Sequence, residues 1–321
     1  MLVIAALFAY AVLLGGPVAR LLTRARWVTR FPQAALRSWH ACALSLLASV
    51  VGFLLLVAHD LWEHAMVWLF RADEPLVHEA YGGSWLVADI PRAALAVLFL
   101  GAMTLIGLTL RSLLRLRRER NRHLLTADAL GEHDRIHDPD VRVLRHTAPA
   151  VFCIPGTRNN SRIVVTTTAL DMLSDSELAA ALEHERAHLK YRHHRAFLAA
   201  DVLTSAFGWS GLSRGYAQQV RRLAEMAADD RAAQQHGRRA VASALLEMCA
   251  AGPTVTVSGL PAMTGTDPAE RIRRLIRATP SQAKALAPAL SLAVTALVLA
   301  LPVILALTPA ALLAGTADSG C

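Results

Sequence analysis

The chain has 321 residues, of which 54% are hydrophobic and 18% are charged, and its mean hydropathy is +0.38. This apolar excess excludes an ordinary soluble globular protein and indicates segments that span a membrane. A net charge of +8 is also typical of proteins that bind nucleic acid. Here the arginines cluster beside apolar runs, so we attribute the charge to membrane topology. We predict a lipid bilayer as a partner and no direct contact with nucleic acid.

Four apolar stretches are each close to the ~20 residues that a helix needs to cross a bilayer. We predict three transmembrane helices in a membrane domain of residues 1–111 and a fourth helix nearer the C-terminus, at about 2–19, 41–58, 93–110 and 285–312. The first stretch lacks the basic n-region of a cleaved signal peptide, so we expect it to be retained. No two cysteines form a C-x-x-C pair, which argues against a cysteine metal site and a disulfide framework.

The distribution of arginine predicts the orientation of these helices. The connections at 20–37 and 111–122 are rich in arginine, as is the stretch before the last helix, whereas the loop at 59–92 is acidic. Because positive charge stays on the cytoplasmic side, we predict a multi-pass protein of the plasma membrane with both termini outside. Residues 112–284 then form a cytosolic domain, and 313–321 form a short outer tail. The aromatic residues of the outer loop fit an interfacial belt or a small sensing surface.

The sequence of the predicted cytosolic domain changes from a strand-like pattern of apolar residues to a helical one. Short β-branched runs predict the strands of a small sheet at 141–144, 150–154 and 163–168. The capping box Ser174-x-x-Glu177 predicts the start of a helix that runs from Asp175 to about Leu203. Further helices are predicted at about 213–236, 240–250 and 269–278. The predicted fold class is therefore α+β, mainly α-helical, with four transmembrane helices and a cytosolic domain that contains a small β-sheet.

The segment His184-Glu185-x-x-His188 lies in the middle of a predicted helix and has the H-E-x-x-H pattern. Residues four apart share one face of a helix, so both imidazoles can bind one zinc ion. A catalytic zinc takes three protein ligands and keeps one position open. We predict Glu225 as the third ligand, because it lies on the next long helix. Asp229, four residues further on, is predicted to accept the N–H of a ligating histidine.

Alternative interpretations exist for the residues around this motif. Taken alone, Glu225 and Asp229 would indicate a solvated helix face that pairs with Arg221, Arg222 or Arg231, but beside the histidines we favour the metal site. His193 and His194 could bind metal or stabilise a transition state. The basic residues around them favour a solvated or membrane-facing surface instead. Asp230 should point about 100° away from Asp229 on an ideal helix.

These motifs and the order of the apolar helices resemble the BlaR/MecR family of membrane metallopeptidases. The resemblance implies three N-terminal spans, a cytosolic zinc-peptidase domain and a fourth span. It also implies regulated cleavage of a cytosolic, BlaI/MecI-like transcriptional repressor. The penicillin-binding sensor domain that follows the last span in antibiotic-sensing members is not found here, so we do not expect β-lactam sensing. HtpX-like quality-control proteases and CAAX-prenyl-protease-like enzymes share the same two motifs and are the alternatives.

The predicted reaction is hydrolysis of peptide bonds in a protein substrate. Beside a zinc ion that makes water more acidic, Glu185 is expected to act as the general base. The substrate is expected to add as a strand to an exposed sheet edge, for which we choose 150–154. A non-catalytic receptor with a relic metal site is a function of a different class. The intact His184, Glu185 and His188 argue against it.

Overall fold

The computed structural model describes residues 2–58, 66–71, 75, 89–133, 140–156, 161–208, 211–251, 267–277 and 286–317. The chain divides into two compact units, which we call unit 1 and unit 2. Unit 1 comprises Met1–Val28, Ala34–Gly107 and Ala283–Cys321, and unit 2 comprises Thr29–Gln33 and Leu108–Gln282. Most of the predicted outer loop and its aromatic residues, the loop at 252–266 and Cys321 lie outside the described residues.

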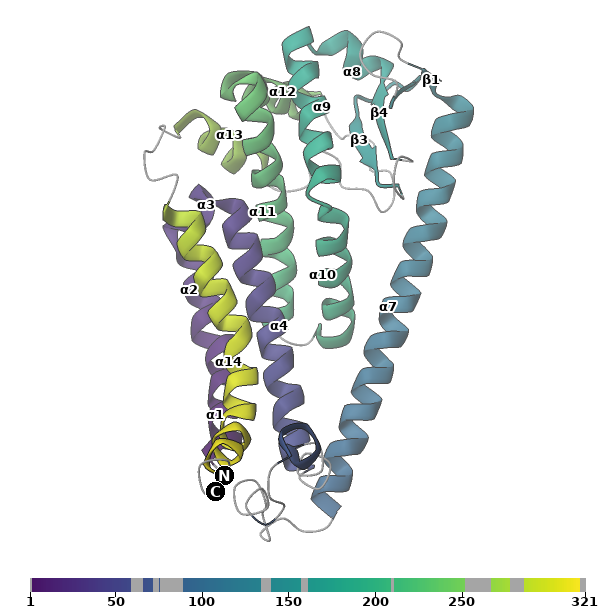
Figure 1. Cartoon of the computed structure of the whole chain (residues 1–321). Helices are drawn as coiled ribbons and strands as arrows, with labels where there is room; N and C mark the ends of the chain where they lie inside the picture. The colour runs from purple at the N-terminus through teal and green to yellow at the C-terminus, as the bar shows by residue number, and fades with distance from the viewer. Residues whose placement is uncertain are drawn as a thin grey trace. The chain divides into compact units, whose positions relative to one another are not determined.

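Unit 1 is built from long apolar helices (Figure 1). A helical run comprises α1 (Leu2–Leu13), a π-helical turn (Leu14–Val18) and α2 (Ala19–Arg24). The π turn contains Pro17, whose missing N–H interrupts the regular helical hydrogen bonding. The short α3 (Arg26–Arg30) follows, and the longer helices of the unit are α4 (Pro32–Val57), the first part of α7 (Asp89–Leu130) and α14 (Leu286–Ala317).

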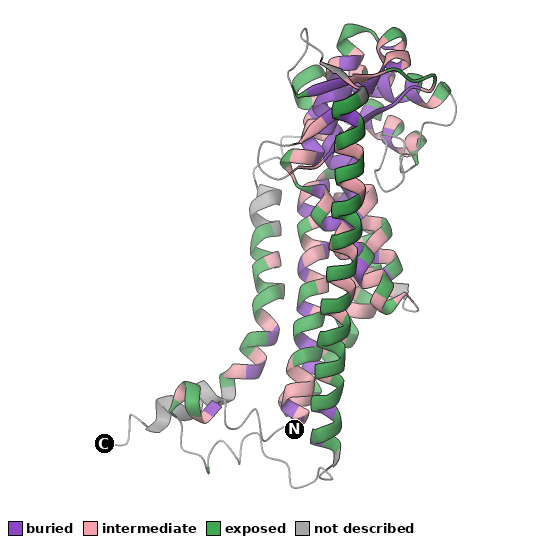
Figure 2. Cartoon of the chain, turned by 90° about the vertical axis from the view of Figure 1, so that its right-hand side faces the viewer, coloured by how far each residue is buried: buried purple, intermediate pink, exposed green. Residues whose placement is uncertain are grey.

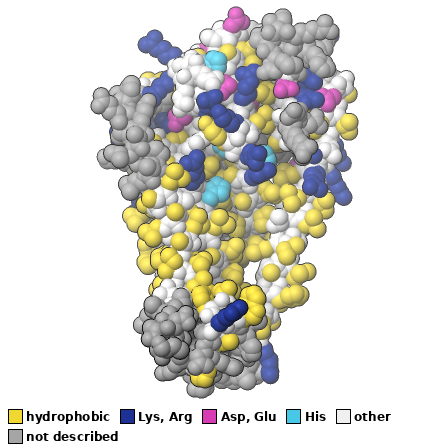
Figure 3. All heavy atoms as spheres, viewed as in Figure 1, with side chains coloured by type: hydrophobic (Ala, Val, Ile, Leu, Met, Phe, Trp, Pro, Cys, Tyr) yellow, Lys and Arg dark blue, Asp and Glu magenta, His cyan; other side chains and the backbone are white. Residues whose placement is uncertain are grey.

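Three of these helical segments are long and apolar enough to cross a membrane, namely Val3–Arg24, Pro32–Val57 and Ile90–Ala129. Within α14 the searched residues contain a shorter apolar segment, Leu292–Thr308, so the fourth span stays a prediction. Figure 2 shows that α7 is exposed along most of its length. Between residues 95 and 110 its exposed side chains include seven that are large and apolar, namely Leu95, Val97, Phe99, Leu100, Met103, Ile106 and Leu110. Figure 3 shows hydrophobic side chains over much of the lower surface of the molecule. Such a surface is typical of a helix in contact with lipid.

A polar contact inside unit 1 ties α14 to α1 and α4. The carbonyl of Val298 would normally accept a hydrogen bond from the N–H of residue 302, but that residue is Pro302 and has none. Tyr10 donates its hydroxyl to this carbonyl at 3.0 Å, and Ser45 does so at 2.6 Å. A carbonyl without a partner is costly in an apolar environment. The two hydroxyl groups therefore satisfy the carbonyl that the proline leaves free.

Unit 2 contains a four-stranded sheet of β1 (Glu132–His133), β2 (Val141–Leu144), β3 (Val151–Ile154) and β4 (Arg162–Thr166) in the order β1-β2-β4-β3. β2 and β4 are parallel, and the other two pairs are antiparallel. The predicted strands are confirmed with small shifts, and β1 was not predicted. The prediction of a strand through Thr168 was wrong, because Thr166 caps α8 (Thr167–Met172) by accepting a hydrogen bond from the N–H of Ala169.

Both faces of the sheet are buried, which explains why its strands read as nearly continuous apolar runs. Val151 and Val165 pack on one face against Leu178 and Leu182 of α9 (Asp175–Lys190). Side chains that alternate with them along the strands, among them Phe152 and Val164, lie on the other face in a cluster with Ala127 of α7. The sheet is thus held between two helices, and β3 is one of its edges.

The remaining helices of unit 2 are α10 (His193–Phe207), α11 (Gly211–His236), α12 (Arg238–Ala250) and α13 (Pro268–Arg277). The capping box at Ser174 and Glu177 starts α9 as predicted. The prediction of one helix from Asp175 to about Leu203 was wrong, because the chain breaks at Tyr191 and Arg192. Arg192 has φ 54° and ψ 42°, a left-handed conformation that ends α9 before α10 begins. α9 and α10 both pack along α11 (Figure 1).

Candidate metal centre

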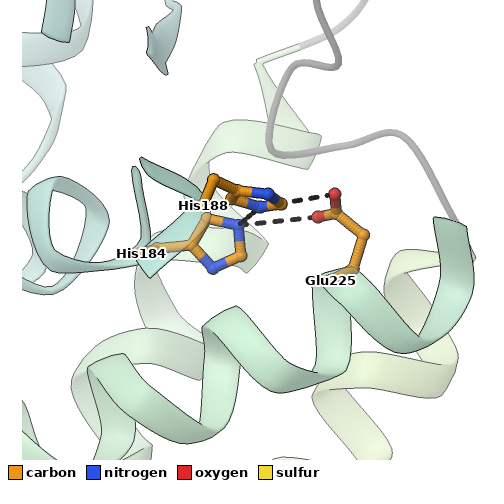
Figure 4. A group of neighbouring side chains, drawn as sticks. All are labelled: His184, His188 and Glu225. Carbon is orange, nitrogen blue, oxygen red and sulfur yellow. Dashed lines mark hydrogen bonds and ion pairs between the residues drawn. The ribbon is translucent and has the colours of Figure 1, made fainter. Parts of the chain in front are cut away.

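Three side chains converge between α9 and α11, as Figure 4 shows: His184, His188 and Glu225. The Nε2 atoms of the two histidines are 3.2 Å apart. One oxygen of Glu225 lies 3.5 Å from Nε2 of His184, and its other oxygen lies 3.5 Å from Nε2 of His188. All three side chains are buried. The helical spacing of four residues produces this arrangement, because it points both imidazoles at α11.

The spacing of these atoms fits a zinc ion. Tetrahedral zinc with bonds of about 2.0–2.1 Å keeps its ligand atoms roughly 3.3 Å apart. The observed separations of 3.2 and 3.5 Å lie close to that value. Two imidazole nitrogens and a carboxylate are also a donor set that catalytic zinc sites use. Burial lowers the pKa of His188 to about 4, so this ring is neutral and offers a lone pair.

Asp229 lies beside His184, the other predicted ligand. Its Oδ1 is 3.1 Å from Nδ1 of His184, and neither side chain is exposed to solvent. Burial by itself lowers the pKa of His184, but hydrogen bonds to Asp229 and Glu225 raise it to about 9. The pocket therefore favours a positive charge at this position, and a metal ion there would take the place of the proton. The structure thus brings Asp229 next to the predicted ligand His184.

Arg271 on α13 closes the far side of the two carboxylates and was missed by the sequence analysis. Its guanidinium is 1% exposed, and its Nη1 lies 3.0 Å from Oε2 of Glu225. It also donates two hydrogen bonds to Asp229. Burial by itself raises the pKa of both carboxyl groups, but their charged neighbours lower both pKa values overall. Arg271 is the main cause for Asp229. The pKa of Glu225 falls to about 2. We had interpreted Arg271 only as one of several arginines that set the membrane topology.

Glu185 lies next to the three converging side chains but is not one of them. It is 2% exposed, and its Oε2 accepts a hydrogen bond of 3.0 Å from the backbone N–H of Cys153 on β3. Burial raises the pKa of Glu185 to about 7. A carboxyl group with a pKa near neutrality can both accept and release a proton at physiological pH.

The interpretation of His193 as part of a solvated or membrane-facing surface was wrong. Its side chain is 1% exposed, and its Nδ1 lies 3.0 Å from Nδ1 of His188. The break at Arg192 starts a new helix there, so the ring of His193 turns back towards α9. His194, the next residue, is only partly buried.

The arginines that we considered as partners of Glu225 and Asp229 bind other carboxylates. Their partners are Asp201 for Arg221, Glu270 for Arg222 and Glu183 for Arg231. The side chains of Glu225 and Asp229 are 3% and 0% exposed, so a solvated face is excluded.

Asp230 points away from the histidines and binds Arg274 on α13. The Oδ2 atom of Asp230 accepts a hydrogen bond of 2.5 Å from Nη2 of Arg274. Arg274 also donates from Nε to the carbonyl of Thr29 at 2.7 Å. Thr29 lies in the connection between the first two apolar segments, and this part of the connection belongs to unit 2.

Comparison with known proteins gives two matches. The model of peptidase family M48 matches residues 116–279, just over half of the chain, and this range contains every side chain of the candidate centre. A curated relative, Protease HtpX homolog 2 of Methanosarcina mazei, is 36% identical over 67 residues, which are 21% of this chain and 23% of that protein. The chain thus spans about a quarter of this relative. No solved structure shows a significant match.

These matches support the broader prediction of a membrane metallopeptidase and do not extend to the BlaR/MecR resemblance. The apolar helices and the buried group of two histidines and a glutamate agree with that prediction. Because the family model covers just over half of its length, the chain belongs to peptidase family M48, a family of metallopeptidases.

Proposed function

We propose that the protein is a membrane-embedded zinc metalloendopeptidase in which His184, His188 and Glu225 hold the ion and Glu185 is the general base. The observation that carries this proposal is the convergence of three buried ligand atoms at separations that suit tetrahedral zinc. The position of Glu185 beside them, with a pKa near neutrality, supports the second part.

The surrounding side chains support distinct steps of such a hydrolysis. Zinc at this position would polarise the scissile carbonyl and make water acidic enough to lose a proton near neutral pH. Glu185 accepts that proton and passes it to the leaving amine. Asp229 accepts the Nδ1–H of His184, which directs the lone pair of Nε2 towards the ion. Arg271 holds the carboxylates of Glu225 and Asp229 in place.

The edge strand β3 is the proposed docking site for the substrate. In the antiparallel pair with β4, Ala150 bonds with Thr166, so Val151 and Cys153 direct their backbone groups away from β4. The hydrogen bond from the backbone N–H of Cys153 to Glu185 supports this choice, because it brings this side of β3 next to the proposed general base. A peptide that adds to this side of β3 would pass beside Glu185 once Val151, which is buried in this structure, becomes accessible.

We favour an HtpX-like quality-control protease, which cuts damaged membrane proteins, over a protease dedicated to a transcriptional repressor. The relative named Protease HtpX homolog 2 supports this choice. Cleavage of a BlaI/MecI-like repressor rests on the sequence resemblance alone.

The proposed topology has four spans, both termini outside and the metal centre in the cytoplasm. The arginine-rich connections support it, as do the hydrogen bonds that tie α14 to α1 and α4. A reporter that is active only in the cytoplasm should be active when fused after Arg122 and silent after Glu79. The reverse pattern would contradict the orientation.

The test of the function uses the full chain, purified in lipid nanodiscs. Wild-type protein should contain about one zinc per chain and should cut an unfolded protein while sparing a folded repressor. The Glu185→Ala variant is the control for contaminating proteases and should cut neither. A wild-type protein that binds no zinc would contradict the proposed function. Selective cleavage of the repressor would favour a regulatory protease over a quality-control protease.

A further inference from the structure

The break between α9 and α10 is held by a strained residue. Arg192 has φ 54° and ψ 42°, a conformation that is unfavourable for residues other than glycine. Its side chain is exposed, so packing of that side chain does not explain the strain. A left-handed residue commonly ends a helix, and here it also sets the direction in which the next residue points.

The residue that this break positions is His193. In a continuous helix, a residue five positions after His188 would lie about 140° away from it around the axis. The break removes that separation and brings the two Nδ1 atoms to 3.0 Å. The rings meet nearly at right angles, with an interplanar angle of 83°. The contact is fully buried, since His193 is 1% exposed and His188 is 6% exposed.

The protons of the two rings can be assigned from their partners. Nε2 of His188 faces the proposed ion, so this nitrogen must carry a lone pair and the proton must be on Nδ1. Nδ1–H of His188 then donates to Nδ1 of His193, which accepts with its lone pair. The proton of His193 lies on its Nε2, which is buried and has no hydrogen-bond partner among the described residues. A buried N–H without a partner costs about 1–3 kcal/mol, so packing alone does not favour a histidine at this position.

We propose that His193 is a positioning residue for the metal centre: it accepts the Nδ1–H of His188 and so fixes the tautomer and orientation of that ligand. The inference rests on the proposed zinc site and adds a partner for the second ligating histidine. Asp229, whose Oδ1 lies 3.1 Å from Nδ1 of His184, is the proposed acceptor for the other histidine. Each of the two imidazoles is then held by a separate acceptor, one a carboxylate and the other a neutral ring.

The test compares two substitutions that differ in hydrogen bonding. In His193→Leu the Nδ1–H of His188 loses its acceptor, and zinc affinity should fall roughly 10–100-fold. In His193→Asn the side-chain oxygen can occupy the position of Nδ1, so affinity should remain close to wild type. Zinc affinity is measured by competition with a chromogenic chelator on the full chain in detergent. The visible absorption of the cobalt-substituted protein gives a second readout, which should change in His193→Leu and not in His193→Asn.

His194→Leu is the matched control, because this neighbour is only partly buried, and both of its readouts should equal those of wild type. His193→Phe keeps an aromatic ring without nitrogen and replaces His193→Leu if that variant does not fold. Unchanged affinity and cobalt spectrum in the apolar variants would overturn the inference. An equal loss of zinc affinity in His193→Asn and His193→Leu would overturn it as well. If the inference is correct, the acceptor that asparagine supplies is enough to restore the affinity. Failure of wild type to bind zinc would instead refute the proposed function from which the inference starts.

Discussion

Arg271 and Asp229 form a bidentate ion pair that is buried. Nε of the arginine donates to Oδ2 of the aspartate at 2.8 Å, and Nη2 donates to Oδ1 at 2.6 Å. The side chains are 1% and 0% exposed. The same guanidinium lies 3.0 Å from Glu225, so one buried positive charge lies against two buried carboxylates. The helix α13, far along the chain, thereby fixes two residues of the candidate metal centre.

The first prediction concerns the loss of this charge. Arg271→Met should destabilise the protein by about 3–5 kcal/mol, because it leaves two buried carboxylates without their cation. The measurement is chemical denaturation of the full chain in detergent. Arg273→Met is the matched control on the same helix. Arg273 pairs at 3.9 Å with Asp267, and both side chains are 62% exposed, so its loss should change stability little. Equal effects of the two substitutions would remove Arg271 from the centre.

The second prediction concerns the acceptor for His184. Asp229→Asn keeps the size of the side chain but removes its charge, and zinc affinity should fall roughly 10–100-fold. Asp230→Asn is the control, because Asp230 binds Arg274 and not a histidine. Zinc affinity of this control should equal that of wild type. If Asp229→Asn binds zinc as wild type does, His184 is held by another group.

The third prediction separates metal binding from chemistry. Glu185→Ala should retain about one zinc per chain, since two histidines and Glu225 remain, but should lose nearly all turnover. Glu225→Ala leaves two imidazoles, so zinc content and activity should fall together, as they should in His184→Ala and His188→Ala. Elemental analysis and cleavage of an unfolded protein provide the two measurements. Retained activity in Glu185→Ala would refute its assignment as the general base.

The fourth prediction concerns the carbonyl of Val298. Ser45→Ala removes one of its two donors and should lower stability by about 0.6 kcal/mol, the average for polar contacts between membrane helices, and by no more than about 1.7 kcal/mol. Pro302→Ala restores a backbone N–H for this carbonyl, so Ser45→Ala should cost less in that background. A double-mutant cycle by thermal unfolding measures the difference. Additive effects would show that the hydroxyl of Ser45 does not replace the bond that Pro302 omits.

The sequence predicted those parts of the centre that depend on local helical geometry. His184 and His188 lie four apart on one helix, and Glu225 and Asp229 do so on another, so the shared faces follow from the spacing. Arg271 lies 42 residues from Asp229, and nothing in its surroundings distinguishes it from Arg273 or Arg274. Only the tertiary packing of α13 selects it.

For the fold as well, the sequence predicted the local elements and missed features that depend on tertiary structure. The strands, the capping box and the long apolar helices follow from periodicity and local hydrogen bonding. The break at Arg192 was not predictable in this way, because no glycine or proline marks it. The position of His193 depends on that break. β1, with two residues, is too short to give a periodic signal.

The hydrogen bond from Arg274 to the carbonyl of Thr29 bears on how this enzyme can be divided. Residues 29–33 belong to the same compact unit as residues 108–282, although 74 residues of sequence separate the two segments. A recombinant fragment that begins after α7 leaves the membrane would omit the acceptor that Arg274 uses. Unit 2, which carries the candidate metal centre, is therefore built from two separate segments of the sequence. A fragment that is meant to keep unit 2 intact would have to include residues 29–33 together with the helices of the candidate metal centre.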